Sequence, residues 1–339
     1  MLIIVMVMSC DEPETLLTNY VHPDGSVTRK IEIRNVTSVF DPSKFQLPVD
    51  SSWNTRDSIE INEKGDTVWV RRAEKLFSGI DEINAAYAND SGCNREFTRN
   101  AAFRKSFRWF NTNYRFSENV KNIMTFGDPL EKYMNADELT CFYSPQTLKD
   151  ELKKSADSLK YKALEDSVEV KSQNWLLNSA VQEWIGYFSK LTHENEQSEM
   201  ISNLNKQQPE IIRMIKEKYD KNFDSLWESG VILRSFIGEE NALKFRREAD
   251  SALTIVSKEI LTDFKDYSVS IVMPGKLIGT NGYNDNNKAL LWPVRSDFFF
   301  TQPYEMWAES KVTNVWAWIV SGLFLLFVLT GVIIKIKKG

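Results

Sequence analysis

The chain has 339 residues and a formal net charge of −5, from 42 lysines and arginines against 47 aspartates and glutamates. A mildly acidic chain without a sustained basic run outside its tail excludes nucleic acid as the expected partner. Only two histidines are present, which leaves little material for histidine-rich metal sites or histidine-based catalysis. The length between the two apolar ends is enough for one large domain or two.

The amino-terminal segment is an apolar run that ends in Ser9 and Cys10. It resembles the lipobox of bacterial lipoproteins, in which an aliphatic residue and a small residue precede the cysteine. The resemblance implies a lipoprotein signal at residues 1–9, removed ahead of an acylated Cys10, and a lipidated linker at 10–16. No positive charge precedes the apolar run, which departs from the pattern. The alternatives are a true start upstream of Met1, or an apolar strand that ends in a free thiol.

Strand patterns follow the linker. Alternating apolar and polar residues predict a strand over 26–36, and two further strands, 57–62 and 66–70, flank a hairpin loop. The next run, 71–90, has apolar residues at helical spacing and predicts an amphipathic helix. Alternation returns over 105–116 and predicts one long central strand.

The period changes in the middle of the chain. Between residues 127 and 264 apolar residues recur every three or four positions and charged residues fill the gaps. This segment predicts four or more helices, with Pro145 and Pro209 near helix starts and Gly230 and Gly238 where the chain turns.

Strand patterns then return over 267–273, 289–294 and 302–311. We predict an α+β fold in which residues 17–126 plus 265–311 form a membrane-proximal, split antiparallel β-sheet domain. An all-helical bundle at 127–264 is inserted into it. The alternative is three consecutive modules, which would leave each β half with few strands and exposed edges.

The last apolar run, 315–334, has twenty residues without a charge. At about 1.5 Å per residue a helix of this length is roughly 30 Å long, the thickness of the bilayer core. Trp316 and Trp318 mark its upstream edge, and a basic tail at 335–339 follows. The positive-inside rule predicts a transmembrane helix with a cytoplasmic carboxy terminus and the body outside. The alternative, a buried core helix, leaves the flanking lysines unexplained.

Together the two ends predict residence in the bacterial inner (cytoplasmic) membrane. A single acyl chain gives marginal membrane binding, whereas a spanning helix is effectively irreversible. A lipoprotein held by such a helix cannot travel to an outer membrane.

The carboxy-terminal β segment carries a further resemblance. A turn at Pro274-Gly275 follows an apolar strand, Asn281 lies in the next loop, Trp292 lies at a strand end, and Tyr304 precedes the apolar helix. With the lipobox and the helix, this order is similar to that of the LppM-type bacterial lipoproteins. The resemblance implies an extracytoplasmic α+β domain that binds lipid or glycolipid and has no catalytic residues. The large helical insertion departs from the family pattern.

A search for catalytic motifs finds no phosphate-binding loop, dinucleotide fingerprint or hydrolase nucleophile elbow. Acidic pairs in the predicted helices lie beside lysines, as on solvated helix faces. His193 lacks the second histidine of a zinc-protease helix. We therefore predict no catalytic residue, metal or cofactor. The alternative is a cell-envelope enzyme with an acidic active site between the sheet and the helical insertion.

Basic and aromatic residues interleave in the predicted central strand. Arg104, Arg108, Trp109 and Arg115 are the predicted ligand-binding residues. Guanidinium groups would bind the phosphate of an anionic lipid headgroup, and aromatic rings would contact acyl or sugar faces. The alternative is a sheet strand with buried aromatic side chains and arginines paired with acidic neighbours.

Cys93 and Cys141 remain once Cys10 is assigned to lipidation, and they either form a disulfide in an oxidising compartment or remain two thiols. The sequence predicts a non-enzymatic, membrane-anchored envelope lipoprotein, held by acylated Cys10 and the 315–334 helix. Its predicted ligand is a lipid or a glycan at the membrane surface, or a partner protein. A protein partner is expected on the helical insertion, because amphipathic helices offer grooves to other helices.

Overall fold

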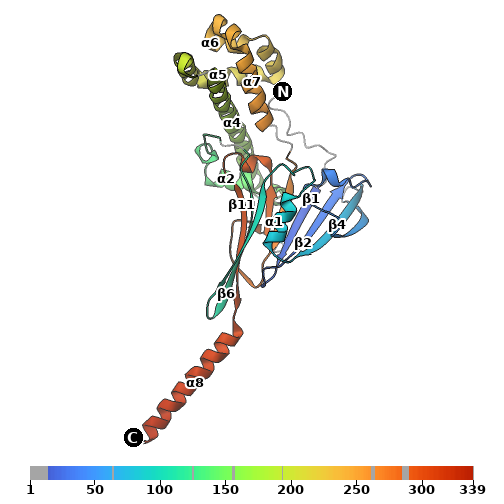
Figure 1. Cartoon of the computed structure of the whole chain (residues 1–339), viewed down its shortest axis with the longest axis vertical. Helices are drawn as coiled ribbons and strands as arrows, with labels where there is room; N and C mark the ends of the chain where they lie inside the picture. Colours follow the sequence, from blue (N-terminus) through green and yellow to red (C-terminus); the bar gives the residue numbers. More distant parts are fainter. Residues whose placement is uncertain are drawn as a thin grey trace. The chain divides into compact units, whose positions relative to one another are not determined.

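The computed structural model describes residues 14–62, 65–123, 126–154, 157–192, 194–260, 264–284 and 290–338 (Figure 1). The chain divides into two compact units. The helical unit comprises Asn122–Phe264 and Ser296–Gln302, and the sheet unit comprises 14–121, Lys265–Arg295 and 303–338. Each unit is therefore built from segments that are distant in the sequence. The predicted signal at 1–9 and Cys10 lie outside the described residues.

The sheet unit contains a seven-stranded sheet in the order β3-β4-β2-β1-β7-β10-β9. Buried and exposed side chains alternate along β1 and β2, so one face of this sheet packs on the core. The strands are β1 (Glu14–Val21), β2 (Val27–Asn35), β3 (Asn54–Ile61), β4 (Thr67–Phe77), β7 (Tyr267–Val272), β9 (Tyr283–Asn284) and β10 (Leu290–Val294).

Strands β1 and β7 are neighbours although the helical segment lies between them in the sequence. They pair in parallel, with Leu16 opposite Ser268 and Tyr20 opposite Val272. The other described pairs of this sheet are antiparallel. A parallel pair requires a long crossover connection, and the inserted helices form part of it here. The predicted α+β class with helices inserted between strands is confirmed, and the β1–β7 pair departs from the antiparallel pattern.

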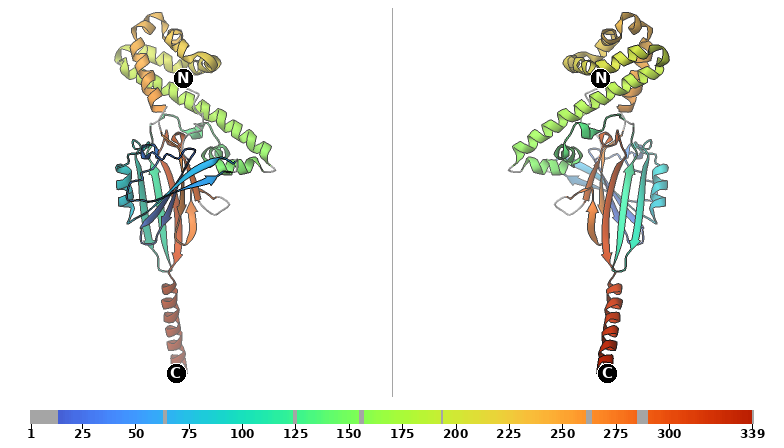
Figure 2. Two further views of the ribbon diagram at one scale, coloured as in Figure 1. Left: turned by 90° about the vertical axis from the view of Figure 1, so that its right-hand side faces the viewer. Right: turned by 90° about the vertical axis from the view of Figure 1, so that its left-hand side faces the viewer.

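A second, four-stranded sheet has the order β5-β6-β11-β8 with antiparallel pairing throughout. Helix α1 (Ile80–Ala88) contacts β5 and buries Ile83 and Tyr87. Figure 2 shows the strands of the sheet unit from two opposite sides. The strands of this sheet are β5 (Arg99–Phe107), β6 (Asn111–Val120), β8 (Lys276–Thr280) and β11 (Tyr304–Thr313).

The structure corrects the predicted helix over 71–90. Residues up to Phe77 belong to β4, and the helix begins only at Ile80. Ala73 and Phe77 are both buried, and their spacing of four residues fits one face of a strand as well as one face of a helix. The apolar spacing of this segment therefore could not separate the two structures.

The predicted single strand over 105–116 is also wrong, because the chain reverses after Phe107. The backbone N–H of Arg108 donates to the carbonyl of Asn111 at 2.8 Å, and the reverse bond measures 3.1 Å. Two residues, Trp109 and Phe110, thus form the loop of a β-hairpin. The alternation of side chains continues on both sides, and no glycine, proline or Asn-Gly pair marks the turn in the sequence.

Six α-helices form most of the described helical unit, which confirms the prediction of four or more. Pro145 directly precedes α3 as expected, whereas Pro209 lies inside α5 and not at a helix start. The helices are α2 (Ala136–Tyr143), α3 (Gln146–Lys153), α4 (Ser158–Leu191), α5 (Glu194–Glu228), α6 (Val231–Lys244) and α7 (Arg246–Ile260). Short 3₁₀ turns occupy Pro42–Lys44 in the sheet unit, and Leu130–Lys132 and Ser296–Phe299 in the helical unit.

Two tryptophans join the long helices. The ring of Trp184 stacks on Phe188 at 5.4 Å between centroids and meets Trp227 edge-on at 5.6 Å. Trp184 Nε1 donates to the carbonyl of Ala249 at 3.2 Å, and Trp227 Nε1 donates to Asp250 Oδ1 at 2.8 Å. Helices α4, α5 and α7 therefore share an aromatic core whose N–H groups are hydrogen-bonded.

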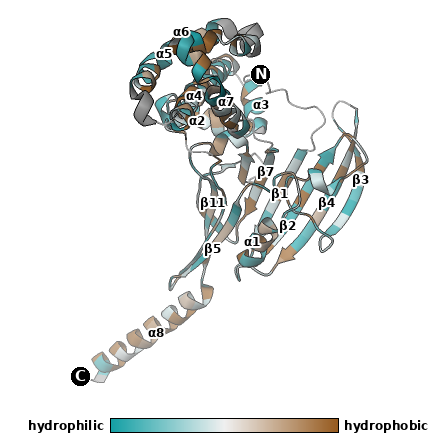
Figure 3. Ribbon diagram, turned by 45° about the horizontal axis from the view of Figure 1, so that its top comes forward, coloured by the Kyte–Doolittle hydropathy of each residue, from teal (hydrophilic) through white to brown (hydrophobic). Residues whose placement is uncertain are grey.

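Helix α8 (Val315–Lys338) ends the chain. Within its segment Val315–Lys337, the most apolar stretch of 18 residues has a mean hydropathy of 2.5 and is almost entirely exposed. Among the described helices it is the one that is long and apolar enough to cross a membrane. Figure 3 shows hydrophobic residues along most of its length.

Glu138 in α2 binds α4. Both oxygens of its carboxylate accept a hydrogen bond from Lys171 Nζ, each at 2.7 Å. The carboxylate also accepts from the Ser167 hydroxyl at 2.7 Å and from the Asn135 backbone N–H at 2.9 Å. The bond from Lys171, together with those from Asn135 and Ser167, lowers the pKa of Glu138 from 4.5 to about 2. The charged carboxylate thus caps α2 and connects it to α4.

We expect this contact to make stability depend on pH. The depressed pKa means that the contribution is fully present above about pH 4.5 and is lost as the pH falls toward 2, because the unfolded carboxyl takes up a proton first. The measurement is the thermal unfolding midpoint as a function of pH between about 4.5 and 2. The midpoint of Glu138→Gln should fall less steeply with decreasing pH than that of the wild type. The exposed Glu199→Gln should retain the wild-type slope. Equal slopes for all three proteins would contradict the assignment.

Candidate membrane-surface site

Asn314 joins the β5–β6 hairpin to the start of α8. Its side-chain Nδ2 donates to the carbonyls of Arg108 and Trp109 at 2.8 and 3.1 Å, and its Oδ1 accepts from Thr112 Oγ1 at 3.0 Å. Its backbone N–H donates to the carbonyl of Phe110 at 2.9 Å. One side chain therefore holds the hairpin turn against the residue that precedes the apolar helix.

Aromatic side chains surround this joint. Phe107 lies parallel to Trp316 at 6.3 Å between ring centroids, and Trp109 meets the same indole edge-on at 5.3 Å. Phe110 packs against Trp318 at 4.3 Å. We call these five residues the aromatic collar. Three come from the hairpin and two from α8, so its halves are some 200 residues apart in the sequence.

The collar is open to the surroundings and reaches along the helix. Its side chains are between 37 % and 57 % exposed, which is high for a cluster of this size. Trp109 Nε1 also donates to Ser321 Oγ at 2.9 Å, in the second turn of α8. The hairpin tip thus lies beside the first two turns of the apolar helix.

The predicted ligand-binding residues separate into two groups. Arg108 and Trp109 lie at the hairpin turn, within the joint and collar just described. Arg104 lies farther up β5, exposed, and opposite Arg115 in the strand register.

Arg115 has neighbours of its own. Its guanidinium lies 4.2 Å from the centre of the Trp307 ring and 3.4 Å from Glu305 Oε1. Arg115 therefore contacts a ring and a carboxylate. This agrees with the alternative interpretation of the strand, in which its arginines pair with acidic neighbours. Its role as a ligand residue stays a prediction.

A buried ionic cluster lies between the two sheets, and sequence analysis missed it. Arg29 on β2 pairs with Glu118 on β6, and each side chain is 2 % exposed. Tyr87 of α1 accepts from Arg29 at 3.0 Å and donates to Glu118 Oε2 at 3.1 Å. Arg99 on β5 pairs with Asp90, also out of contact with solvent. The only available signal was Arg29, a charged residue at an inward position of the predicted strand over 26–36.

The cluster holds two cations and two anions, so its charges balance. Burial raises the pKa of Tyr267 to about 12 and also raises that of Tyr87, which keeps both phenols neutral. Each carboxylate is bound to an arginine and neither reaches solvent. This geometry gives a substrate no access, and removal of either partner would leave a buried charge without its counter-charge.

The two remaining cysteines are free thiols in this structure. Cys93 Sγ donates to the carbonyl of Phe45 at 3.2 Å, and burial raises the pKa of its thiol. Cys141 is buried beside the Tyr161 hydroxyl at 3.6 Å.

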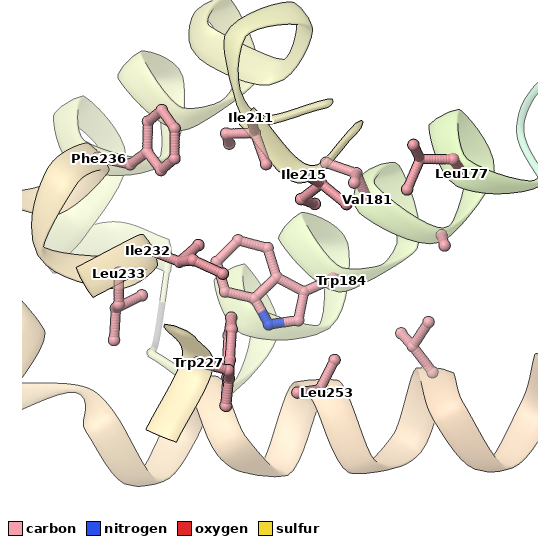
Figure 4. A pocket seen from close by; sticks show the side chains of 12 residues that line it. Leu177, Val181, Trp184, Ile211, Ile215, Trp227, Ile232, Leu233, Phe236 and Leu253 are labelled. Carbon is pink, nitrogen blue, oxygen red and sulfur yellow. The ribbon is translucent and has the colours of Figure 1, made fainter. Parts of the chain in front are cut away.

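The helical unit has an apolar pocket among α4, α5, α6 and α7 (Figure 4). Its twelve lining residues are all apolar, among them Ile211, Ile232, Trp184 and Trp227. Both indole N–H groups already have partners in α7. The pocket therefore offers contact area but no polar group for chemistry. The predicted protein contact on this segment stays a prediction.

Within the described ranges, no three His, Cys, Asp or Glu side chains gather as they would around a metal ion. His193 lies outside those ranges. The alternative prediction of an acidic enzyme site stays a prediction.

No family model matches the chain. No curated protein sequence matches it either. The folded domain of the LppM protein of Mycobacterium tuberculosis, solved by NMR, aligns with 90 % of this chain and 92 % of its own length. The identity is 6 % and the TM-score 0.27, which does not establish a common fold.

We expect Asn314→Ala to loosen the joint. Without the side-chain amide, the turn carbonyls of Arg108 and Trp109 lose their donors, so backbone amides of the hairpin tip should exchange hydrogen faster. Hydrogen exchange of the detergent-solubilised chain, read by mass spectrometry, measures this. The matched variant Asn113→Ala, two residues into β6, should exchange like the wild type, because the Asn113 side chain has no hydrogen bond to any residue that the structure describes. Unchanged exchange at residues 107–112 in Asn314→Ala would contradict the joint.

The ionic cluster predicts a strong effect of Glu118→Gln. The substitution keeps the shape of the side chain but leaves Arg29 buried without a counter-charge, which typically costs about 3–5 kcal/mol. The thermal midpoint should fall by about 6 °C or more. Glu74→Gln, which breaks the exposed pair with Lys30, should shift it far less. Similar decreases of the thermal midpoint in both variants would show that the buried pair contributes no more to stability than the exposed one.

Proposed function

We propose that this protein is a non-enzymatic lipoprotein of the bacterial cell envelope that holds an α+β body at the membrane surface. Helix α8 would cross the inner membrane, with the body outside and the tail in the cytoplasm, and Cys10 would carry an acyl anchor. The ligand would be a lipid or glycolipid of that membrane. One observation carries the proposal: aromatic side chains of a folded domain gather at the start of an apolar helix long enough to span.

The collar supports a position at the membrane surface. Tryptophan side chains favour the headgroup region, where an apolar ring and a polar N–H are both accommodated. Trp316 and Trp318 belong to α8 itself, and tryptophans are common at the ends of spanning helices. Trp109 is held at the same edge by its hydrogen bond to Ser321, so the sheet unit itself would touch the lipid.

The far end of α8 supports the orientation. Lys335, Lys337 and Lys338 follow the apolar run, and basic residues of this kind are enriched on the cytoplasmic side. The acyl chain on Cys10 would then hold the amino end of the body to the outer leaflet, while α8 makes the attachment permanent.

The binding role is favoured over an enzymatic one by the state of the buried carboxylates. Glu118 and Asp90 are each neutralised by an arginine, and a general acid or base needs access to a substrate proton. No described feature favours the enzyme alternative.

The intact mass of the chain extracted from bacterial membranes tests the lipid anchor. We expect the mass of a chain that begins at Cys10 plus acyl groups, and we expect Cys10→Ala to lose both the cleavage and the added mass. Cys93→Ala is the matched control, because its thiol lies in the folded body, and it should keep the acyl groups.

An unmodified chain that begins at Met1 would remove the acyl anchor from the proposal. The orientation is tested by fusing alkaline phosphatase, which is active only outside the cytoplasm, after Gly339. The fusion should be inactive, and an active fusion would reverse the proposed topology.

A further inference from the structure

The part of the sheet unit nearest α8 is rich in basic residues, and Glu309, opposite Arg115 on β6, is the acidic residue of β11 that lies nearest to α8. Three segments meet there: residues 100–116 of the β5–β6 hairpin, 268–283 around β8, and 310–338 of β11 and α8. None contains an aspartate or glutamate, although such residues make up 47 of the 339 in the chain. A sign bias confined to one end of a fold indicates a charged partner at that end.

Strand register brings the basic residues of these segments to one face. Arg104 on β5 lies opposite Arg115 on β6, and Asn113, two residues away, shares its face. Asn113 lies opposite Lys311 on β11, which in turn lies opposite Lys276 on β8. Side chains opposite one another in a sheet point to the same side.

Arg104, Lys276 and Lys311 therefore share one face of the four-stranded sheet, and Arg108 lies at its hairpin tip. We call these four residues the basic face. All four are exposed, and within the described residues none has a carboxylate partner. Arg115, on the same face but farther from α8, is paired with Glu305. Lys276, Lys311 and Arg108 lie nearer α8 than Arg115 does, whereas Arg104 lies level with Arg115 in the strand register. Glu309 is opposite Arg115 and two residues before Lys311, so one carboxylate shares this face at its far end.

The basic face lies close to the membrane that α8 would enter. Lys311 precedes the first helical residue by four positions, about 13 Å of extended strand. Arg108 is nearer still, because its carbonyl binds Asn314. Long basic side chains can extend toward a polar interface, and charges interact over a screening length of about 8–10 Å. Headgroup phosphates are therefore within electrostatic reach.

We infer that the basic face binds the anionic headgroups of the lipids around α8, so that the protein selects phosphatidylglycerol-type lipids over zwitterionic ones. This inference rests on the proposed function in one respect, the insertion of α8. It goes beyond the proposed function by specifying that the lipid ligand is anionic and that the four residues of the basic face bind its headgroup. The partner is a lipid surface because the collar already fixes this end of the sheet beside the apolar helix.

Native mass spectrometry of the full-length chain in a neutral detergent tests the inference. The protein is titrated with palmitoyl-oleoyl phosphatidylglycerol or with the phosphatidylcholine of the same acyl chains. We expect the anionic lipid to bind about tenfold more tightly, because each basic residue near an anionic surface contributes several-fold. The preference should shrink as salt is raised.

A fourfold variant, Arg104→Gln, Arg108→Gln, Lys276→Gln and Lys311→Gln, should lose the preference. Its matched control changes the same charge on exposed lysines of the helical unit that have no ion pair in the described structure: Lys160→Gln, Lys162→Gln, Lys206→Gln and Lys258→Gln. The control should retain wild-type selectivity. Equal binding of the two lipids by the wild type, or equal loss in both variants, would overturn the inference.

Two further measurements separate lipid binding from binding of a soluble anion, and the role of the basic face from the insertion of α8. Displacement of the lipid by low millimolar inorganic phosphate, or equal binding of soluble polyphosphate, would assign the face to a soluble anion and overturn the lipid assignment. Alkaline carbonate extraction of membranes reports on α8 alone, and both variants should stay in the membrane. Extraction of the wild type would contradict the proposed function, whereas a wild type that stays in the membrane but binds the two lipids equally would contradict only the role of the basic face.

Discussion

The pairing of β11 with β6 is the constraint on which the arrangement of the sheet unit next to α8 depends. Ten consecutive residue pairs join them, from Tyr304 opposite Val120 to Thr313 opposite Asn111. Since β6 begins directly after the β5–β6 turn, this register places the end of β11, and hence the start of α8, at the hairpin tip. The bonds of Asn314 and the stacking of the collar follow from that placement. A shift of one residue would turn every side chain of β11 to the other face.

The two sheets are joined by charge rather than by apolar packing alone. Arg29 and Glu118 come from strands of different sheets, and each would be costly to bury without the other. The pair therefore selects one arrangement of β2 against β6. Strand β6 carries Glu118 and also begins at the β5–β6 hairpin turn. The buried pair and the exposed basic residues are therefore connected through the same four-stranded sheet.

Sequence patterns predicted the fold class and the carboxy-terminal apolar helix well because both depend on composition and period. Strand and helix were confused over 71–90, where Ala73 and Phe77 fit either period. The turn at Trp109 and Phe110 escaped detection because aromatic residues occupy the position where glycine or asparagine is usual. Arg108 and Trp109 were identified as unusual, but their link to α8 depends on β11 pairing with β6, which is a long-range contact. The Arg29–Glu118 pair depends equally on tertiary contacts.

With α8 spanning a bilayer, as proposed above, the joint at Asn314 has a consequence for bilayers of different thickness. A spanning helix that is longer than the hydrocarbon layer accommodates the mismatch by tilting. A body connected to its helix through a flexible linker would not follow that tilt. Here the first two turns of α8 are bonded to the hairpin tip, and β11 runs into the helix with one residue between them. A thinner membrane would therefore incline the sheets together with the helix, and the angle of the body would report the thickness of the lipid layer beneath it.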